Sequence, residues 1–296
     1  MTEHLVDDNI LALTEALALR KAASGNIKIN ALLDDQHDRA RKDLQEPVKI
    51  EDVDTFPKPG DLYIDKRKWL RMQNVVAVSA DLKDSTALSF NKYAQTSARL
   101  YEAATGSAVR LMAKFDPQFM DIQGDGIFGL FHGKRAFERA LCAAVTLKSF
   151  SGRSLAPLID ELFADNFPDT GFKVGMSAGV LVAKKVGVRG TNEPVWAGKP
   201  VNYAVKCAGK ADRHELIATS NVYDKFVGNE YVTHSCGCPT GVPVPLWVDV
   251  EVEKLGKHSQ CKLLPVGWCK QHGDEFCAAI LDGKRKRDDV SGQAAA

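Results

Sequence analysis

The sequence predicts an α+β fold in which helices pack on a single sheet. Three observations support this prediction. Hydrophobic residues make up 45% and charged residues 26% of the 296 residues, as is typical of a globular chain. Strand-like and helix-like segments alternate through the middle of the chain. Two of the strand-like segments flank a Gly-Asp-Gly turn, which indicates a β-hairpin. A sheet with helices on one face satisfies this order.

Local periodicity predicts each element in turn. Residues 75–80 are mostly apolar and include three β-branched valines, which indicates a buried strand. Apolar residues recur at three- and four-residue spacing between Tyr93 and Phe115, which predicts a helix. Residues 119–131 form the predicted hairpin, with its turn at 124–126. The remaining predictions are a helix over 136–150, a strand or strand pair over 172–188, a helix over 201–211 and a strand over 216–220.

The two ends of the chain have a different character. Residues 1–70 predict a helical leader, with one amphipathic helix around 10–19, a poorly packed polar stretch across 31–43 and a proline-glycine break at 55–60. We place the main domain at 71–282 and expect 283–296 to be a solvated, flexible basic tail. Acidic residues precede the apolar residues of the N-terminus, so we expect no secretory signal.

Overall charge excludes some classes of function. The 39 basic and 38 acidic residues give a net charge of +1, which provides no broad basic field for a nucleic-acid partner. No apolar run approaches the about 20 residues that a membrane span requires. Seven cysteines, an odd number, favour reduced thiols. We therefore expect a cytoplasmic protein.

The C-terminal third carries several possible zinc ligands, but their spacing differs from the paired C-x-x-C motifs of a zinc ribbon. Buried free cysteines on strands, around 268–269 and 276–277, are the favoured interpretation. The candidate ligands are His234, Cys236, Cys238, Cys261, Cys269, His272 and Cys277.

Two carboxylates stand at positions where side chains leave the core. Asp81 ends the first buried strand and Asp125 lies in the hairpin turn. If the hairpin lies beside that strand, the two carboxylates face each other. Paired oxygen ligands suit Mg²⁺ or Mn²⁺ when the phosphates of a nucleotide supply the remaining ligands. On these two residues alone, a helix cap at Asp81 and a simple turn at Asp125 remain the alternative.

Four motifs in order carry a family resemblance. Residues 78–82, 124–128, 174–179 with 186–187, and 198–206 resemble the first metal strand, the metal hairpin, the glycine-spaced strand pair and the helix motif of class III nucleotidyl cyclases. The resemblance covers about residues 72–230. It implies a ferredoxin-like, palm-type fold with a mixed, mostly antiparallel sheet.

The resemblance also implies roles for individual residues. Asp81, the Leu82 carbonyl and Asp125 would bind two Mg²⁺ or Mn²⁺ ions, and Ser85 and Thr86 would adjoin the amides that cradle the triphosphate. The ribose 3′-oxygen would attack the α-phosphate in line, and pyrophosphate would leave.

The helix motif supplies the other half of the implied site. Asn202 would hold the ribose, and Lys206 would neutralise charge on the transferring phosphate. Their four-residue spacing places them on one helix face. In this family one subunit supplies the metal aspartates and the other supplies the asparagine and the basic residue, so we expect a homodimer. Lys254, Lys257 and Lys262 are further candidates for a phosphate contact.

Two positions depart from the family pattern. Asp84 stands where glycine is usual, and Lys206 stands where the family has arginine. A carboxylate at position 84 repels phosphate unless it turns away to cap a helix at Ser85.

The residues that read the base also differ. Asp121, four residues before Asp125, stands where adenylate cyclases have lysine and guanylate cyclases have glutamate. Val195 is near the second base-reading position, where adenylate cyclases have aspartate. The lysine–aspartate pair that reads adenine is thus missing, whereas a single carboxylate can read guanine, uracil or cytosine. Phe119 or Trp196 would fill the space that a purine would occupy.

A narrower resemblance favours a pyrimidine. Residues 196–204, and a short leader before a single cyclase domain, resemble the bacterial pyrimidine cyclases of the Pycsar anti-phage defence system. The resemblance implies cyclic UMP or cyclic CMP as the product, with UTP slightly favoured as the substrate, and a separate effector that responds to it. The alternatives are a purine cyclase and a catalytically silent dimerisation module. Both metal aspartates and the asparagine are present, which argues against the silent module.

Overall fold

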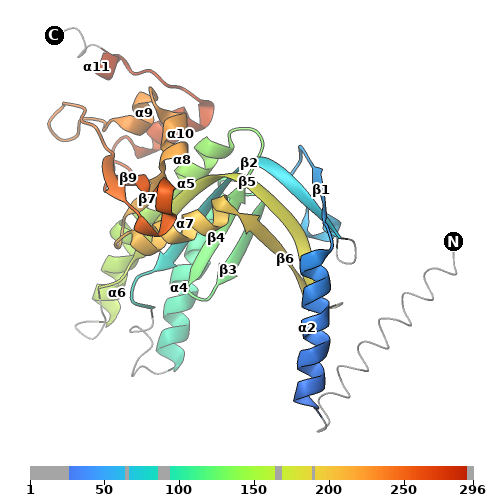
Figure 1. Ribbon diagram of the computed structural model, residues 1–296. Coiled ribbons are helices and arrows are strands. Elements are labelled where there is room, and N and C mark those ends of the chain that lie inside the picture. The colour runs from blue at the N-terminus through green and yellow to red at the C-terminus, as the bar shows by residue number, and fades with distance from the viewer. Residues whose placement is uncertain (1–26, 64–66, 86–93, 164–168, 189–190, 292–296) are drawn as a thin grey trace.

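The structure is a computed structural model that describes residues 27–63, 67–85, 94–163, 169–188 and 191–291 (Figure 1). The helix predicted around residues 10–19 and the site residue Thr86 lie outside these ranges. Among the described helices, none has the length and apolar character needed to cross a membrane.

A mixed sheet forms the centre of the molecule. In the described residues it has nine strands, with the main order β3-β4-β2-β5-β7-β9-β8, while β1 pairs with β2 and β6 pairs with β5. The β1–β2 and β5–β7 pairs are parallel and the other pairs are antiparallel. The strands are β1 (Lys49–Asp52), β2 (Lys68–Leu82), β3 (Phe119–Gln123), β4 (Gly126–Phe131), β5 (Phe172–Val188), β6 (Thr191–Gly198), β7 (Leu216–Thr219), β8 (Val248–Glu251) and β9 (Gln260–Leu264).

The helices confirm most of the periodicity-based predictions. The predicted helix over 136–150 coincides with α5, and the long strand signal at 172–188 is one continuous strand, β5, that turns back into β6. The helices are α2 (Ile29–Gln45), α4 (Ala94–Ala113), α5 (Ala136–Phe150), α6 (Ala156–Phe163), α7 (Lys199–Lys210), α8 (Ser220–Tyr223), α9 (Glu230–Thr233), α10 (Gly273–Asp282) and α11 (Asp288–Ser291). Short helical turns η1 (Pro59–Asp61), η2 (Ser151–Leu155), η4 (Asp224–Phe226) and η5 (Glu253–His258) complete the order.

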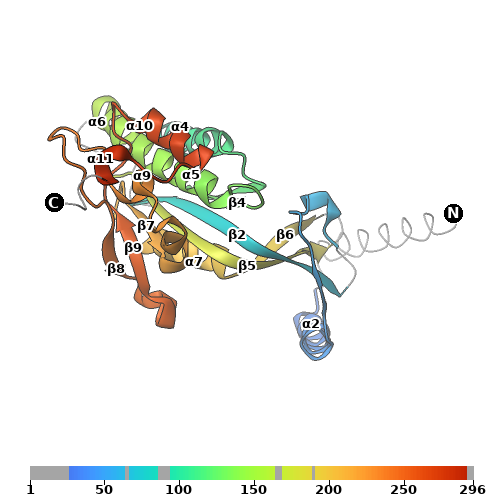
Figure 2. The same ribbon diagram turned by 90° about the horizontal axis from the view of Figure 1, so that it is seen from above.

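Helices cover both faces of the sheet, so the prediction of helices on one face was wrong. Alternate residues of β2, such as Val76 and Val78, pack into a core with α4 and α5. The opposite face carries α7, which lies so close that a Cβ at Gly175 would collide with the Ala204 carbonyl. Figure 2 shows α4, α5, α6 and α10 on one side of the sheet and α7 on the other. Since β2 and β5 are apolar on both faces, each face requires its own cover.

The segment before β2 contains α2, which stands apart from the sheet (Figure 1). None of its residues is buried, yet the polar stretch 31–43 is helical. An ion pair between Asp35 and Arg39, four residues apart, supports the helix locally. Arg67, which directly precedes β2, connects the C-terminal end of α2 to the rest of the protein. Its guanidinium donates to the Asp43 carboxylate at 2.5 Å and to the Glu46 carbonyl at 2.6 Å.

The last residue of the basic run after α10, Arg287, is packed against the protein, whereas Lys284, Arg285 and Lys286 are exposed. The prediction of a solvated tail was therefore wrong for Arg287. The Arg287 side chain is 6% exposed and lies 4.6 Å above the Phe276 ring. Its guanidinium donates to the Ser235 carbonyl at 2.8 Å, and its backbone amide donates to the Glu230 carboxylate at 2.6 Å. A planar guanidinium combines ring stacking with several hydrogen bonds, and this allows it to be buried.

Candidate active site

The end of β2 and the β3–β4 hairpin lie side by side, as the sequence predicts. β4 pairs antiparallel with β2 through Ala80 and Ile127, so Gly126 comes next to Asp81. A Cβ built on Gly126 would lie 3.1 Å from the Ala80 carbonyl oxygen and 3.4 Å from Asp81 Oδ1. One carboxylate oxygen of Asp81 therefore faces the hairpin, in which Asp125 directly precedes Gly126.

The other carboxylate oxygen of Asp81 has a partner on β5. Lys173 stands opposite Asp81 in the strand register, and its Nζ lies 3.0 Å from Asp81 Oδ2. The Asp81 side chain is 43% exposed, whereas that of Lys173 is 18% exposed. Sequence reasoning missed Lys173. The antiparallel register of two neighbouring strands was the signal that could have found it.

The chain turns sharply immediately after β2. Asp84 has a φ of 55°, in the left-handed region that glycine adopts freely and aspartate tolerates better than most residues. This backbone conformation accounts for the glycine that the cyclase pattern has at the same position. Ser85 follows as a half-buried residue. Thr170 Oγ1 donates to the Lys83 carbonyl at 2.6 Å and holds the turn against the segment before β5.

The helix α7 presents Asn202 and Lys206 away from the sheet. A helix advances about 100° per residue, so both positions lie about 200° around the axis from Ala204, which contacts the sheet. Asn202 is exposed and Lys206 is partly exposed. Within one chain, these side chains therefore point away from the sheet that holds Asp81. The buried residues of α7 are Pro200, Ala204, Cys207 and Ala208.

A basic surface adjoins this outer face of α7. Lys206 Nζ donates to the Lys254 carbonyl of η5 at 3.0 Å and lies 5.7 Å from the centre of the Tyr203 ring. Lys199 Nζ lies 3.2 Å from His258 Nε2. Lys199, Tyr203, Lys257 and His258 border a cavity of about 260 Å³. Of the other candidate lysines, Lys262 is paired with Asp249 at 2.6 Å.

Asp121 lies on β3 beside a cluster of aromatic rings. It is exposed, and its Oδ1 accepts a hydrogen bond from the Ile122 amide at 2.9 Å. Phe119, two residues earlier, points to the same side of the strand. The centre of the Phe119 ring lies 4.8 Å from that of Trp196 and 5.7 Å from that of Phe128.

The two neighbouring residues Val195 and Trp196 point to opposite sides of β6. Trp196 is 7% exposed and stacks on Phe56 at a centroid distance of 5.1 Å. Val195 is 37% exposed. Side chains alternate along a strand, so the structure brings Trp196 together with Phe119 and leaves Val195 on the other side.

Six of the seven cysteines fall into two groups. Cys142, Cys207 and Cys261 are buried free thiols, and Cys261 lies on β9. The prediction that residues 268–269 and 276–277 lie on strands was wrong, because Cys269 lies in the connection after β9 and Cys277 lies in α10. The ligand atoms of Cys236, Cys238, Cys269 and His272 gather within 4.8 Å of one another.

The thiols of this group have different environments. The backbone amides of Gln271 and His272 donate to the Cys269 sulfur and lower the pKa of that thiol to about 6. Desolvation, followed by the neighbouring Cys236 and Cys269 thiols, raises the pKa of the Cys238 thiol to about 11.

Comparisons with known proteins identify the family. No family model matches the chain. A curated uridylate cyclase from Micromonospora echinofusca is 43% identical over 247 residues, covering 82% of this chain and 78% of that protein. A curated uridylate cyclase from Propioniciclava tarda is 42% identical over 247 residues, covering 82% and 80%. The chain belongs to the uridylate cyclase family. It is therefore a nucleotidyl cyclase, and the predicted family and enzyme class are confirmed.

Solved structures confirm the fold. The crystal structure of the adenylyl cyclase CyaB from P. aeruginosa matches with a TM-score of 0.54 and 13% identity, covering 68% of this chain and 97% of that one. The crystal structure of the guanylyl cyclase Cya2 matches with a TM-score of 0.50 and 14% identity, covering 66% and 91%. The chain thus has the class III cyclase fold that the four motifs predict.

Proposed function

We propose that this member of the uridylate cyclase family converts UTP to cyclic UMP and pyrophosphate. Two curated relatives, 43% and 42% identical, carry the name uridylate cyclase. The observation that carries the proposal is the approach of Asp81 Oδ1 to the hairpin that holds Asp125. That arrangement places one Asp81 carboxylate oxygen beside the hairpin, and the chain turns at Asp84 soon after Asp81.

The donor set at the end of β2 fits a divalent cation such as Mg²⁺ or Mn²⁺. Carboxylate and carbonyl oxygens are the ligands that these ions prefer. Asp81, Asp125 and the Leu82 carbonyl would hold two ions together with the substrate phosphates. When bound, the ions would lower the pKa of the ribose 3′-hydroxyl and stabilise charge on the α-phosphate. Asp81 Oδ1 faces the hairpin, so this oxygen is available although Oδ2 is paired with Lys173.

The remaining contacts come from a second copy of the chain. Asn202 and Lys206 lie on the outer face of α7 and point away from the sheet that holds Asp81. A symmetric homodimer would bring the α7 face of one subunit to the carboxylates of the other and would form two equivalent sites. In such a site the Asn202 amide orients the ribose. Lys206 and the nearby Lys257 neutralise phosphate charge.

The base contacts favour a single-ring base. The Asp121 carboxylate accepts a hydrogen bond from a base N–H, and uracil offers one at its ring nitrogen. The rings of Phe119 and Trp196, in contact at a tilted angle, occupy volume on the same side of the sheet as Asp121. A purine requires more room than a pyrimidine, so these rings support selection by size as well as by hydrogen bonding.

One experiment tests the substrate. The purified full chain is incubated separately with ATP, GTP, CTP and UTP in the presence of Mn²⁺, and the products are identified by mass spectrometry. We expect cyclic UMP to form fastest. If cyclic CMP forms fastest, the enzyme is still a pyrimidine cyclase, but its preferred substrate is CTP rather than UTP. Dominant cyclic GMP or cyclic AMP would overturn the proposal in favour of a purine cyclase, and no product from any nucleotide would favour the silent module.

The proposed biological role is the production of a messenger in anti-phage defence. Its support is the resemblance of residues 196–204 to the Pycsar cyclases. A cyclic nucleotide carries the signal to a separate effector protein. Cells that express the chain with its native neighbouring genes should resist phage, and Asp81→Asn should abolish resistance at unchanged protein level. Resistance that survives this substitution would contradict the role.

A further inference from the structure

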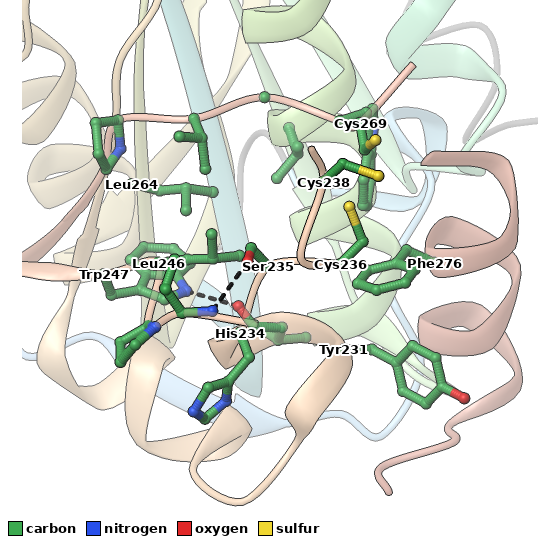
Figure 3. Close-up of a pocket in the computed structure, with 18 of the residues that line it drawn as sticks. Tyr231, His234, Ser235, Cys236, Cys238, Leu246, Trp247, Leu264, Cys269 and Phe276 are labelled. Atoms are coloured by element: carbon green, nitrogen blue, oxygen red, sulfur yellow. Dashed lines mark hydrogen bonds between the residues drawn. The ribbon is translucent and has the colours of Figure 1, made fainter. Parts of the chain in front are cut away.

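Three thiols and an imidazole converge in the C-terminal third of the chain. Cys236 and Cys238 come from the long connection between α9 and β8, and Cys269 and His272 come from the turn that leads into α10. Their ligand atoms all lie within 4.8 Å of one another. Figure 3 shows the sulfur atoms of Cys236, Cys238 and Cys269 pointing toward a common space. None of these residues belongs to the cyclase motifs.

The distances match tetrahedral zinc coordination. Zn–S bonds of about 2.3 Å and Zn–N bonds of about 2.0–2.1 Å at tetrahedral angles require an S···N separation of about 3.6 Å. His272 Nδ1 lies 3.4 Å from Cys238 Sγ and 3.8 Å from Cys269 Sγ, on either side of that value. All three cysteines are free thiols rather than disulfide partners.

The sequence spacing of the ligands is short on each side of the cluster. Cys269 and His272 form a C-x-x-H pair in the turn before α10. The C-x-C pair at 236–238 completes the ligand set from the opposite side. Three soft sulfur donors and one imidazole select zinc over the oxygen-preferring Mg²⁺ and Mn²⁺.

The tip of the α9–β8 connection has little hydrophobic packing to hold it in place, so a metal cross-link would stabilise the connection. A cavity of about 470 Å³ lies beneath the α9–β8 connection, between Trp247, Trp268 and Phe276. The tip of the connection exposes Val242 and Val244, each at 52%. The connection thus gains little hydrophobic burial at its tip, and a bond between its base and the turn before α10 would supply part of the missing stability.

We propose that Cys236, Cys238, Cys269 and His272 bind one structural Zn²⁺ ion, with three sulfur ligands and His272 Nδ1. Each coordinating thiol releases its proton to solvent when the ion binds. Four protein ligands fill the tetrahedral shell and leave no position for substrate, so the ion is structural rather than catalytic. It fastens the α9–β8 connection to the start of α10. The proposal does not depend on the nucleotide that the cyclase uses.

Metal content tests the proposal directly. The full chain is expressed in zinc-supplemented medium, desalted, and analysed for metals by inductively coupled plasma mass spectrometry. We expect about one zinc per chain in the parent and less than about one tenth in the double variant Cys238→Ser/Cys269→Ser. Cys277→Ala is the matched control, because Cys277 is a half-buried thiol of α10 outside the cluster, and it should retain one zinc. Asp81→Asn should also retain one zinc, which separates this ion from the catalytic metals.

A second measurement works even if the double variant fails to fold. Co²⁺ is added to the metal-stripped parent, and we expect sulfur-to-cobalt charge transfer with the intense visible bands of tetrahedral cobalt. Removing zinc with a chelator should lower the parent Tm by about 5–10 °C.

Three results would overturn the proposal. A parent without bound zinc and without the cobalt spectrum would do so. Zinc content in the folded double variant equal to that of the parent would also do so. The third is a disulfide among Cys236, Cys238 and Cys269, seen by mass after purification under reducing-agent-free conditions with zinc present.

Discussion

The end of β2 at Asp81 and the cluster at Cys236 are the two proposed metal sites, and they differ in chemistry and in openness. The first offers hard oxygen donors from adjacent strands, and its key carboxylate is 43% exposed. The second offers sulfur and nitrogen donors from two connections, with four protein ligands around one point. An open set of oxygen ligands suits ions that must share a substrate, whereas a closed set suits an ion that holds the fold. The predictions below test this contrast.

The largest effect should follow from changing the open site. Asp81→Asn and Asp125→Asn should each reduce turnover by about 10³-fold or more, because each removes a charged ligand and several kcal/mol of transition-state stabilisation. Steady-state assays with UTP and Mn²⁺ measure the loss, and thermal unfolding checks the fold. Asp160→Asn, an exposed carboxylate on α6, is the control and should retain parental turnover. Full activity in a folded Asp81→Asn protein would remove the basis for the site.

The second prediction tests whether the open site is shared between two chains. Asp81→Ala and Asn202→Ala should each be inactive alone. Co-expressed in equal amounts, they should recover about one quarter of parental activity, because half of the dimers are mixed and each mixed dimer has one intact site. Differently tagged chains and tandem purification isolate the mixed dimers for assay. Mixed dimers that form yet stay inactive would contradict the shared geometry.

The third prediction concerns the base. Asp121→Ala should lower kcat/KM for UTP far more than for the other nucleotides and flatten the preference by about tenfold or more. Competition assays with the four nucleotides measure this ratio directly. Gln123→Ala is the control, since it changes an exposed residue of the same strand. An unchanged preference profile in Asp121→Ala would show that the base is read elsewhere.

The fourth prediction addresses the strand end that leads to the cysteine cluster. Lys148 of α5 is 2% exposed and its Nζ donates to the carbonyls of Leu264 and Val266 at 2.8 and 2.7 Å. Burial lowers the pKa of Lys148 to about 7, and the charge of Glu215 acts in the opposite direction. The unfolded chain therefore binds more protons than the folded protein between about pH 7 and 10.5. Because of this difference, the Lys148 contribution to the free energy of unfolding increases as pH rises through that window.

Lys148→Met removes this dependence. Between pH 7 and pH 9, the free energy of unfolding of the parent should rise by about 2 kcal/mol relative to that of the variant. Urea unfolding of both proteins at the two pH values gives the comparison. Parallel pH profiles would mean that Lys148 titrates near its ordinary pKa.

The two regions also differ in how much of their structure could be predicted from the sequence. The carboxylate motifs are contiguous, and one strand register brings Asp81 to the hairpin, so pattern and periodicity were sufficient to predict that adjacency, while the metal-binding role of the two aspartates stays a prediction. Lys173 was missed because its pairing with Asp81 depends on which strand becomes the neighbour. The cysteine cluster was not favoured because β8 and β9 both lie between its two halves in the sequence, and neither half has the spacing of a zinc ribbon.

The sequence by itself determined the order of helices and strands, the cyclase family and the residue types at the open site. These features are local, because hydrophobic periodicity and turn chemistry act over a few residues. The tertiary structure alone decided which face of the sheet α7 covers, where Asn202 points and which cysteines meet. Those features depend on packing between segments far apart in the chain. The close contact of Gly175 with α7 and the convergence of Cys236, Cys238, Cys269 and His272 are visible only when the segments are assembled.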